Sequence, residues 1–401
     1  MKGHIRRRGD RSWAIVIELD RDPLTGKRRQ KWHTVTGTKR DAERRLTELL
    51  HQVNSGTYVE PTKFTVGAFL ERWLQDYAQG AVRPTTLDSY RYLIERHIAP
   101  ALGRIPLGAL KPLDLQRFYA EKLKSGRLDG RGGLSARSVQ YIHGLLRESL
   151  GSAVKWELIS RNPAEAVNPP RQDRREMQVL DIGDVQAFLE VARGTRFYAL
   201  WMLDVTTGLR RGELLGLRWQ DVDLEAGILT VRQTLVCLRG KILIQPRAKT
   251  QKSIRVVSLP EMTLAALRDH QTQQLDERTF FGPDYEDHGL VFCSPEGRPV
   301  DPNNLASRHF KPLLRQAGLP NIRIQDLRHT HATLLLGAGV NLKLVSDRLG
   351  HTTTRMTADI YSHVLPRMRD EVAAAVDKIL SLDERLQVEG KRPQGGKLEG
   401  K

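Results

Sequence analysis

Residues suited to phosphoryl-group chemistry recur in four short segments of the C-terminal half of the chain. These are Arg210 and Glu213 in TTGLRRGELLGLRW, Lys249 in PRAKTQKSIRVV, Arg328 in IQDLRHTHA, and His351 and Tyr361 in RLGHTTTRMTADIYSHV. Two arginines can bind the non-bridging oxygens of a phosphodiester with bidentate geometry and a permanent charge. A tyrosine hydroxyl can attack as a covalent nucleophile, and a lysine whose pKa is lowered by nearby arginines can protonate the leaving alkoxide. A phosphotyrosine would conserve the bond energy, so we expect no metal and no other cofactor.

The order of these segments along the chain resembles that of the tyrosine recombinases of the phage integrase family. TGLRRGEL resembles the first arginine motif, KTQKSIRVVSLP the β-hairpin lysine segment, DLRHTHATLLL the second arginine motif, LGH the histidine motif and ADIYSHV the nucleophile motif. The resemblance is close over residues 179–365. It implies a site-specific DNA recombinase, or integrase, that cuts and rejoins strands through a 3′-phosphotyrosine and integrates or excises a prophage or mobile element.

The resemblance also implies a role for each matching residue. Arg210 and Arg328 would bind the scissile phosphate, and Tyr361 would attack it. Lys249, which we expect at a hairpin turn between strands, would be the general acid toward the leaving 5′ oxygen. His351 would hydrogen-bond the phosphate.

Polar neighbours of the two arginine motifs could support the site. Glu213 follows the first arginine by one helical turn, where it would orient or buttress the site. The family most often has a histidine three residues before the second arginine, but this chain has Gln325, which cannot accept and return a proton. His329 shares the helix face of Gln325 and could compensate, although we favour a structural role for it. His331 falls on the apolar face and is expected in the core, so a zinc site formed with His329 is not predicted.

Composition points to a nucleic-acid partner. The chain has 401 residues, a formal net charge of +17 and a sequence pI near 10, which favours a polyanionic partner. No run approaches the roughly 18 apolar residues of a spanning helix, and MKGHIRRRGD lacks the apolar core of a signal peptide. We therefore expect no membrane association and a cytoplasmic, nucleoid-associated protein. The two cysteines, Cys237 and Cys293, are expected to be buried apolar residues rather than metal ligands.

Residues 1–57 read as a small N-terminal domain that binds arm-type DNA sites. SWAIVIELD alternates like a half-buried strand, GHIRRRG and KWHTVTG add two more strands, and Thr38 with Asp41 forms a helix-capping signature. We expect the helix to cover one face of the sheet and the basic residues to lie on the other, where they suit a DNA groove. The candidate DNA-binding residues are Arg6, Arg7, Arg8, Arg28, Arg29 and Lys31. A solvated basic surface is the alternative interpretation.

The remaining chain divides by periodicity and composition into an α+β multidomain protein. Residues 61–167 predict a helical, SAM-like bundle that binds the core DNA site, with aromatic stripes such as Phe69, Trp73 and Tyr77 in its core. Residues 168–178 read as a linker and residues 384–401 as a disordered tail. Between them, residues 179–383 predict a mostly α catalytic domain with a small antiparallel sheet formed by GILTVRQTLV, KILIQP and SIRVVSLP.

The implied partners are double-stranded DNA attachment sites and three further copies of this chain, assembled as a tetramer on two duplexes. A helix over 366–381 could dock on a neighbouring protomer or pack within its own chain. An excision factor and a DNA-bending host protein are further possible partners. The alternatives are a type IB topoisomerase-like relaxing enzyme and a non-catalytic DNA-binding regulator whose site decayed at Gln325.

Overall fold

A computed structural model describes residues 3–19, 25–55, 58, 63–172, 178–238, 240–246, 254–351, 353–361 and 376–377. They form two compact units that divide after Arg174. The predicted tail and most of the predicted helix over 366–381 lie outside the described residues. Among the described helices, none is long and apolar enough to span a membrane.

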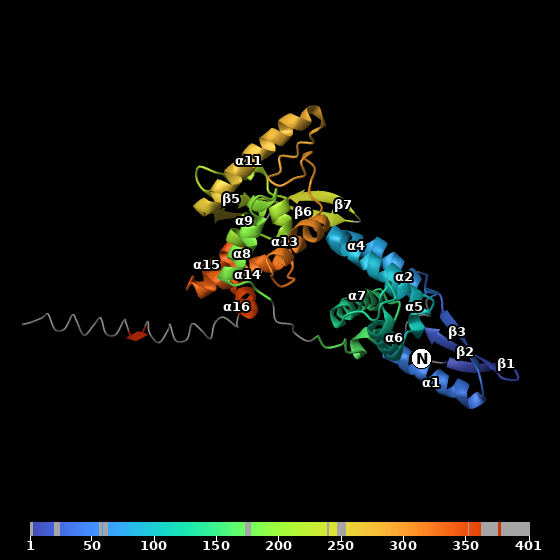
Figure 1. The fold of residues 1–401 in the computed structure, drawn as a ribbon. Coiled ribbons are helices and arrows are strands. Elements are labelled where there is room, and N and C mark those ends of the chain that lie inside the picture. Colours follow the sequence, from blue (N-terminus) through green and yellow to red (C-terminus); the bar gives the residue numbers. More distant parts are fainter. Residues whose placement is uncertain are drawn as a thin grey trace, which may run out of the picture. The chain divides into compact units, whose positions relative to one another are not determined.

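The N-terminal unit begins with the predicted three-stranded sheet and helix (Figure 1). Strands β1 (Gly3–Gly9), β2 (Ser12–Leu19) and β3 (Arg29–Thr36) are antiparallel in the order β1-β2-β3. Helix α1 (Lys39–Asn54) starts with the predicted capping box, in which the backbone and hydroxyl of Thr38 both bind the Asp41 carboxylate. The helix packs on one face of the sheet through Ile15, Ile17 and Leu49. Tyr58 joins this core, one residue beyond the predicted boundary.

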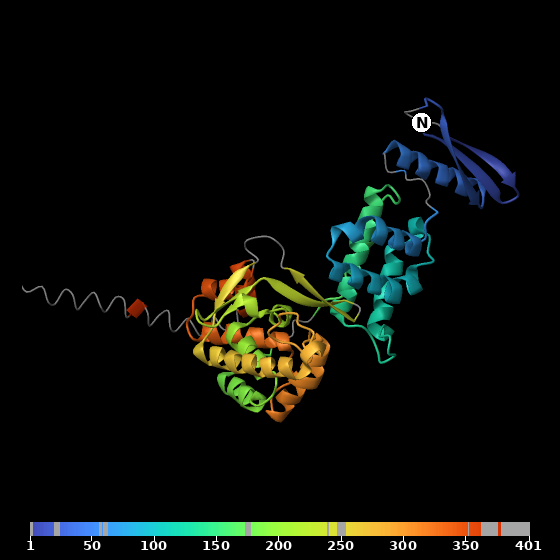
Figure 2. The same ribbon diagram turned by 90° about the horizontal axis from the view of Figure 1, so that it is seen from above.

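Residues 63–172 form a helical bundle (Figure 2). Its helices are α2 (Val66–Trp73), α3 (Gln79–Ala81), α4 (Pro84–Leu93), α5 (Ala99–Leu102), α6 (Pro112–Ser125) and α7 (Ala136–Lys155). Single π-helical segments, Leu74–Ala78 and Ile94–Ile98, join α2 to α3 and α4 to α5. The predicted core stripe holds for Phe69 and Trp73, which are buried, but is wrong for Tyr77, which is 42% exposed. The π-helical turn between Trp73 and Tyr77 changes the angular spacing that the prediction assumed.

The second unit is mostly helical around one large core. Its helices are α8 (Ile182–Ala192), α9 (Tyr198–Thr207), α10 (Arg211–Leu215), α11 (Glu261–Phe281), α12 (Pro302–Asn304), α13 (Lys311–Gln316), α14 (Ile324–Gly337), α15 (Leu342–Leu349) and α16 (Thr354–Tyr361). The buried rings of Phe188, Trp201 and Phe310 contact one another in this core, with the Trp201 and Phe310 ring centroids 5.2 Å apart. This packing joins α8 and α9 to the segment before α13.

Two small antiparallel sheets accompany these helices (Figure 1). One has the order β4-β5-β8, with β4 (Val222–Asp223), β5 (Ile228–Val231) and β8 (Arg255–Ser258); the other pairs β6 (Gln233–Leu238) with β7 (Lys241–Pro246). GILTVRQTLV is therefore two strands in different sheets, and the prediction of one strand is wrong. The strands on either side of Lys249 lie in different sheets, because β7 pairs with β6 and β8 pairs with β5; the turn predicted at Lys249 itself lies outside the described residues. Strand partners depend on tertiary packing that local alternation does not contain.

Candidate active site

Arg210 lies at the sharp connection between α9 and α10. Gly208 ends α9 in the left-handed conformation, with φ +61°, and Arg210 immediately precedes α10. The Arg210 Nη1 donates to Glu213 Oε1 at 2.9 Å, and the backbone N–H of Arg210 donates to Glu213 Oε2 at 3.2 Å. The Glu213 side chain is only 3% exposed, so its buried charge is balanced by a nearby guanidinium. Glu213, which we expect to orient or buttress the site, thus contacts Arg210 directly.

Arg328 lies on α14 and connects two other helix ends. Its Nη1 donates to the Gly208 carbonyl oxygen and its Nη2 to the Leu349 carbonyl oxygen, both at 2.7 Å. The residue is 2% exposed, whereas the Arg210 side chain is 37% exposed. Of the two predicted phosphate-binding arginines, Arg210 is therefore the more accessible.

Three successive carbonyl oxygens at the C-terminal end of α15 accept hydrogen bonds from three arginines. Residues 348, 349 and 350 accept, in that order, from Arg255 Nε at 2.9 Å, Arg328 Nη2 at 2.7 Å and Arg210 Nη2 at 3.2 Å. Gly350 caps the helix with φ +67°. The carbonyl end of a helix carries partial negative charge and unpaired acceptors, so it is suited to hold cations.

Arg255, on β8, was not among the residues predicted for the site. Besides its contact to α15, its Nη2 donates to Glu213 Oε2 at 2.7 Å, and its side chain is 9% exposed. The Glu213 carboxylate therefore bridges Arg210 and Arg255. A charged residue inside the apolar strand run IRVVSL was the signal that sequence reasoning could have used.

His351 follows directly after the α15 cap. Its Nδ1 lies 2.8 Å from the hydroxyl of Thr357 on α16, and its backbone N–H donates to the Ser346 carbonyl. Burial, together with the positive charges of Arg328 and Arg210, lowers the pKa of His351 to about 4. The imidazole is therefore neutral near pH 7. His351 directly follows Gly350 and Leu349, whose carbonyl oxygens accept from Arg210 and Arg328.

His331 is a core residue, as predicted. It is 6% exposed, its Nε2 accepts from Arg348 Nε at 3.2 Å, and its Nδ1 lies 2.9 Å from the Val205 carbonyl oxygen. Because an arginine can only donate, the proton of the neutral ring must sit on Nδ1. Burial lowers the pKa of His331 to about 4. His329 is partly buried, and burial also lowers its pKa.

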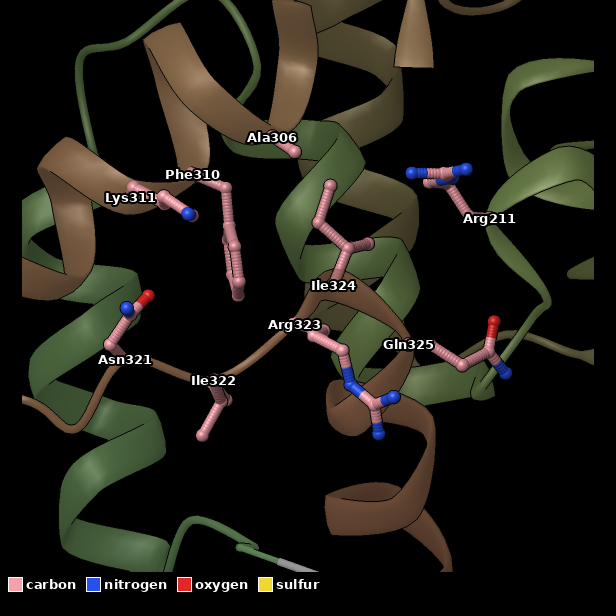
Figure 3. A pocket seen from close by; sticks show the side chains of 9 residues that line it. All are labelled: Arg211, Ala306, Phe310, Lys311, Asn321, Ile322, Arg323, Ile324 and Gln325. Carbon is pink, nitrogen blue, oxygen red and sulfur yellow. The ribbon is translucent and has the colours of Figure 1, made fainter. Parts of the chain in front are cut away.

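Gln325 lies on α14, three residues before Arg328. It lines a pocket of about 420 Å³ together with Arg211, Arg323, Lys311 and a floor that includes Phe310 (Figure 3). Among the described residues, no hydrogen bond joins Gln325 to Arg210, Arg328 or His351.

The two remaining predicted catalytic residues are only partly covered by the structure. Lys249 lies outside the described residues, and for Tyr361 only the backbone, at the end of α16, is described. Thr357, which contacts His351, precedes Tyr361 by one helical turn. In the described part of the chain, no group of three or more histidine, cysteine or acidic residues could hold a metal ion.

The basic residues predicted to bind DNA divide between the two faces of the N-terminal sheet. Arg6 and Arg8 lie over the ring of Trp32, with their guanidinium carbons 5.6 and 5.9 Å from its centroid. Trp32 is 50% exposed and pairs with Val16. The residues on either side of Val16, Ile15 and Ile17, pack with α1, so Val16 and Trp32 project to the other face. This cluster therefore lies on the face opposite the helix, as predicted.

Other predicted DNA-binding residues lie on the helix side. Directly paired residues of antiparallel strands project to the same face, and Lys31 pairs with Ile17, which packs with α1. By the alternation of the strands, Arg29 and Arg7 also project to this side, at exposed positions. The expectation that all these residues share the open face is wrong for Arg7, Arg29 and Lys31. Arg28 is exposed before β3 begins.

Comparisons with known proteins agree with the motifs. Residues 178–368 match the phage integrase family, and residues 65–123 match the phage integrase N-terminal SAM-like domain. An integrase of Streptomyces ambofaciens is 30% identical over 373 residues, which cover 92% of this chain and 93% of the relative. A tyrosine recombinase XerC-like protein of Caldanaerobacter subterraneus subsp. tengcongensis is 27% identical over 389 residues, which cover 92% and 97% of the two chains.

Solved structures share the fold at lower sequence identity. The integrase of transposon Tn1549, in complex with a circular intermediate DNA, has a TM-score of 0.62 at 21% identity and covers 75% of this chain and 95% of its own. A lambda integrase tetramer bound to a Holliday junction has a TM-score of 0.55 at 19% identity and covers 89% and 94%. The predicted mixed fold, mostly helical with small antiparallel sheets, is confirmed. The chain therefore belongs to the phage integrase family and is a tyrosine recombinase.

Proposed function

We propose that this chain recombines DNA at specific attachment sites and that Tyr361 forms the covalent bond to DNA. The Tyr361 hydroxyl attacks the scissile phosphorus, the bond to the 5′ oxygen breaks, and a 3′-phosphotyrosine forms. The free 5′-hydroxyl of a partner strand then attacks this linkage and releases the tyrosine. The observation that supports this proposal best is the convergence of Arg210, Arg328 and His351 on one end of α15.

The arginines stabilise the charge that develops on the non-bridging oxygens. Arg210 is accessible and contacts the phosphate directly. Arg328 is enclosed in the described structure, so DNA must displace a neighbouring group before Arg328 can bind an oxygen. Because both guanidinium groups are already fixed by carbonyl oxygens, little reorganisation is needed when the charge develops.

The neutral His351 completes the phosphate site through its second nitrogen. If the Thr357 hydroxyl donates to Nδ1, the ring proton lies on Nε2, which can donate to a phosphate oxygen. Lys249 protonates the leaving 5′ oxygen in this scheme. Gln325 leaves the usual base position without a proton acceptor, so attack by Tyr361 relies on the positive charge of the arginines to favour the phenolate.

The DNA-binding assignments are proposals of the same kind. The Arg6, Arg8 and Trp32 cluster would contact arm-type sites, and the helical bundle would contact the core site. A tetramer on two duplexes is the expected working assembly, as lambda integrase forms on a Holliday junction. The substrate would be the ends of a prophage or mobile element, recombined in the cytoplasm, with an excision factor and a DNA-bending host protein setting direction.

A nicked suicide substrate tests the chemistry. With a nick near the cleavage point, the short 5′-hydroxyl fragment diffuses away and the protein–DNA adduct accumulates, so wild-type protein should give a band of increased mass on a denaturing gel. Tyr361→Phe should give none while still binding DNA. An adduct in Tyr361→Phe would place the nucleophile elsewhere, and no adduct in wild type would leave only the DNA-binding regulator. Relaxation of supercoils without strand exchange would instead identify a topoisomerase.

A further inference from the structure

Arg255 lies among the hydrogen bonds around Arg210 and Glu213, although the family resemblance assigns it no role. Its Nε donates to the carbonyl oxygen of residue 348, and its Nη2 donates to Glu213 Oε2. Its Nη1 is buried and has no hydrogen-bond partner among the described residues. Because its Nε and Nη2 are already engaged within the protein, we expect any effect of Arg255 on the reaction to pass through these neighbours.

The first neighbour is the carboxylate that Arg255 shares with Arg210. Arg210 Nη1 donates to Glu213 Oε1 at 2.9 Å, and Arg255 Nη2 donates to Glu213 Oε2 at 2.7 Å. A buried carboxylate that loses one charged partner is left with an uncompensated acceptor. Without Arg255, Glu213 Oε2 would lose its charged donor and keep the longer bond from the Arg210 backbone N–H, so the carboxylate would hold the Arg210 guanidinium less firmly.

The second neighbour is the end of α15, which both arginines bind. Arg255 holds the carbonyl of residue 348 and Arg210 holds that of Gly350. Arg255 and Arg210 therefore share two supports, one on Glu213 and one on α15. This closed arrangement makes the position of the Arg210 guanidinium depend on Arg255.

We propose that Arg255 is a positioning residue for DNA cleavage, which fixes Arg210 at the scissile phosphate through Glu213 and the α15 end. The inference rests on the proposed function. Arg255 also begins β8, the first described strand after the segment that contains Lys249. A role through the general acid is thus the competing route, and the test must separate the two.

Arg255→Lys keeps the charge but replaces a planar fork with a single nitrogen, which cannot replace both contacts in the same geometry. Arg196→Lys is the matched control, because Arg196 also binds a partly buried carboxylate, that of Glu277, and also has a buried Nη1 without a partner among the described residues. With the suicide substrate, Arg255→Lys should form adduct about 100-fold more slowly than wild type, the effect of a small misplacement of a catalytic group. Arg196→Lys should keep the wild-type rate.

Two modified substrates identify the route. A methylphosphonate at the scissile position removes the non-bridging charge that Arg210 stabilises, so the difference between wild type and Arg255→Lys should shrink. A bridging 5′ sulfur leaves without a general acid, and on this substrate the difference should persist. The reverse pattern would mean that Arg255 acts through Lys249 and would overturn the proposal.

A double-mutant comparison completes the test. If Arg255 acts through Arg210, Arg255→Lys should add little to the defect of Arg210→Lys; additive defects would refute the mechanism. Rates of adduct formation are measured at a temperature below the thermal unfolding midpoint of every variant. If Arg255→Lys does not fold, Arg255→Gln takes its place. If wild type forms no adduct, the proposed function itself is wrong. If wild type forms adduct and Arg255→Lys forms it as fast as Arg196→Lys does, only this inference is wrong.

Discussion

Replacing Gly350 by alanine would place a methyl group against the side chain of Arg255. The added Cβ would lie 2.9 Å from Arg255 Nη1 and 3.0 Å from its Cδ. The left-handed backbone, with φ +67°, would cost an alanine about 1–2 kcal/mol. Arg255 could relieve the contact only by weakening a hydrogen bond to a charged group, which costs about 1.5–3 kcal/mol. The sum is a loss of about 2.5–5 kcal/mol in the free energy of unfolding of the second unit.

Gly339→Ala is the matched control for this substitution. Gly339 also has a left-handed backbone, with φ +78°, but an added Cβ there meets nothing within 4 Å. It should therefore cost only about 1–2 kcal/mol. Urea unfolding of the full chain, followed by tryptophan fluorescence, measures the difference between the two variants, and the suicide substrate measures cleavage. Equal losses of stability together with unchanged adduct rates in both variants would refute the close packing of Arg255 against Gly350 and its link to the site.

Two other substitutions and one deletion test the site, the core and the N-terminal domain. Gln325→His should leave the adduct rate within about tenfold of wild type, or about 1.4 kcal/mol, because the arginines carry most of the charge stabilisation; a much larger gain would show that a base is missing. Deletion of residues 1–58 should abolish binding to arm-type sites, measured by gel shift, but leave core-site cleavage, and equal loss of both would contradict the domain assignment. The folded pKa of His331 is about 4, so the unfolded chain takes up a proton first as pH falls. Between pH about 6.5 and about 4, this difference in protonation should remove roughly 3 kcal/mol from the free energy of unfolding. If His331→Asn lost as much stability over this pH range as wild type, the prediction would be wrong.

Local signals in the sequence were sufficient where neighbouring residues determine the structure. The capping box of Thr38 and Asp41 formed as predicted, because the two residues are three apart at a helix start. Glu213 was placed one turn after Arg210 by the same spacing, and it contacts Arg210. His331 was assigned to the core from its place on the apolar face of α14. These features need only the period of a helix and the chemistry of its first turn.

Features that join distant segments could not be predicted in this way. Arg255 binds Glu213 from 42 residues away and the end of α15 from 93 residues away. Its role depends on β8 pairing with β5 rather than with β7, and no local pattern specifies that partner. The accessibility of Arg210 relative to Arg328 likewise depends on packing between helices that are far apart in the sequence.

The carbonyl contacts at the end of α15 have a consequence for the entropy of DNA binding. A mobile arginine side chain carries about 2 kcal/mol of rotamer entropy, which is lost when the guanidinium is held in place. Arg210, Arg255 and Arg328 are already held by main-chain oxygen atoms, so their ordering accompanies folding. DNA binding then immobilises mainly the exposed basic side chains elsewhere on the protein. The entropy lost on ordering the catalytic guanidinium groups is part of the free energy of folding and does not weaken DNA binding.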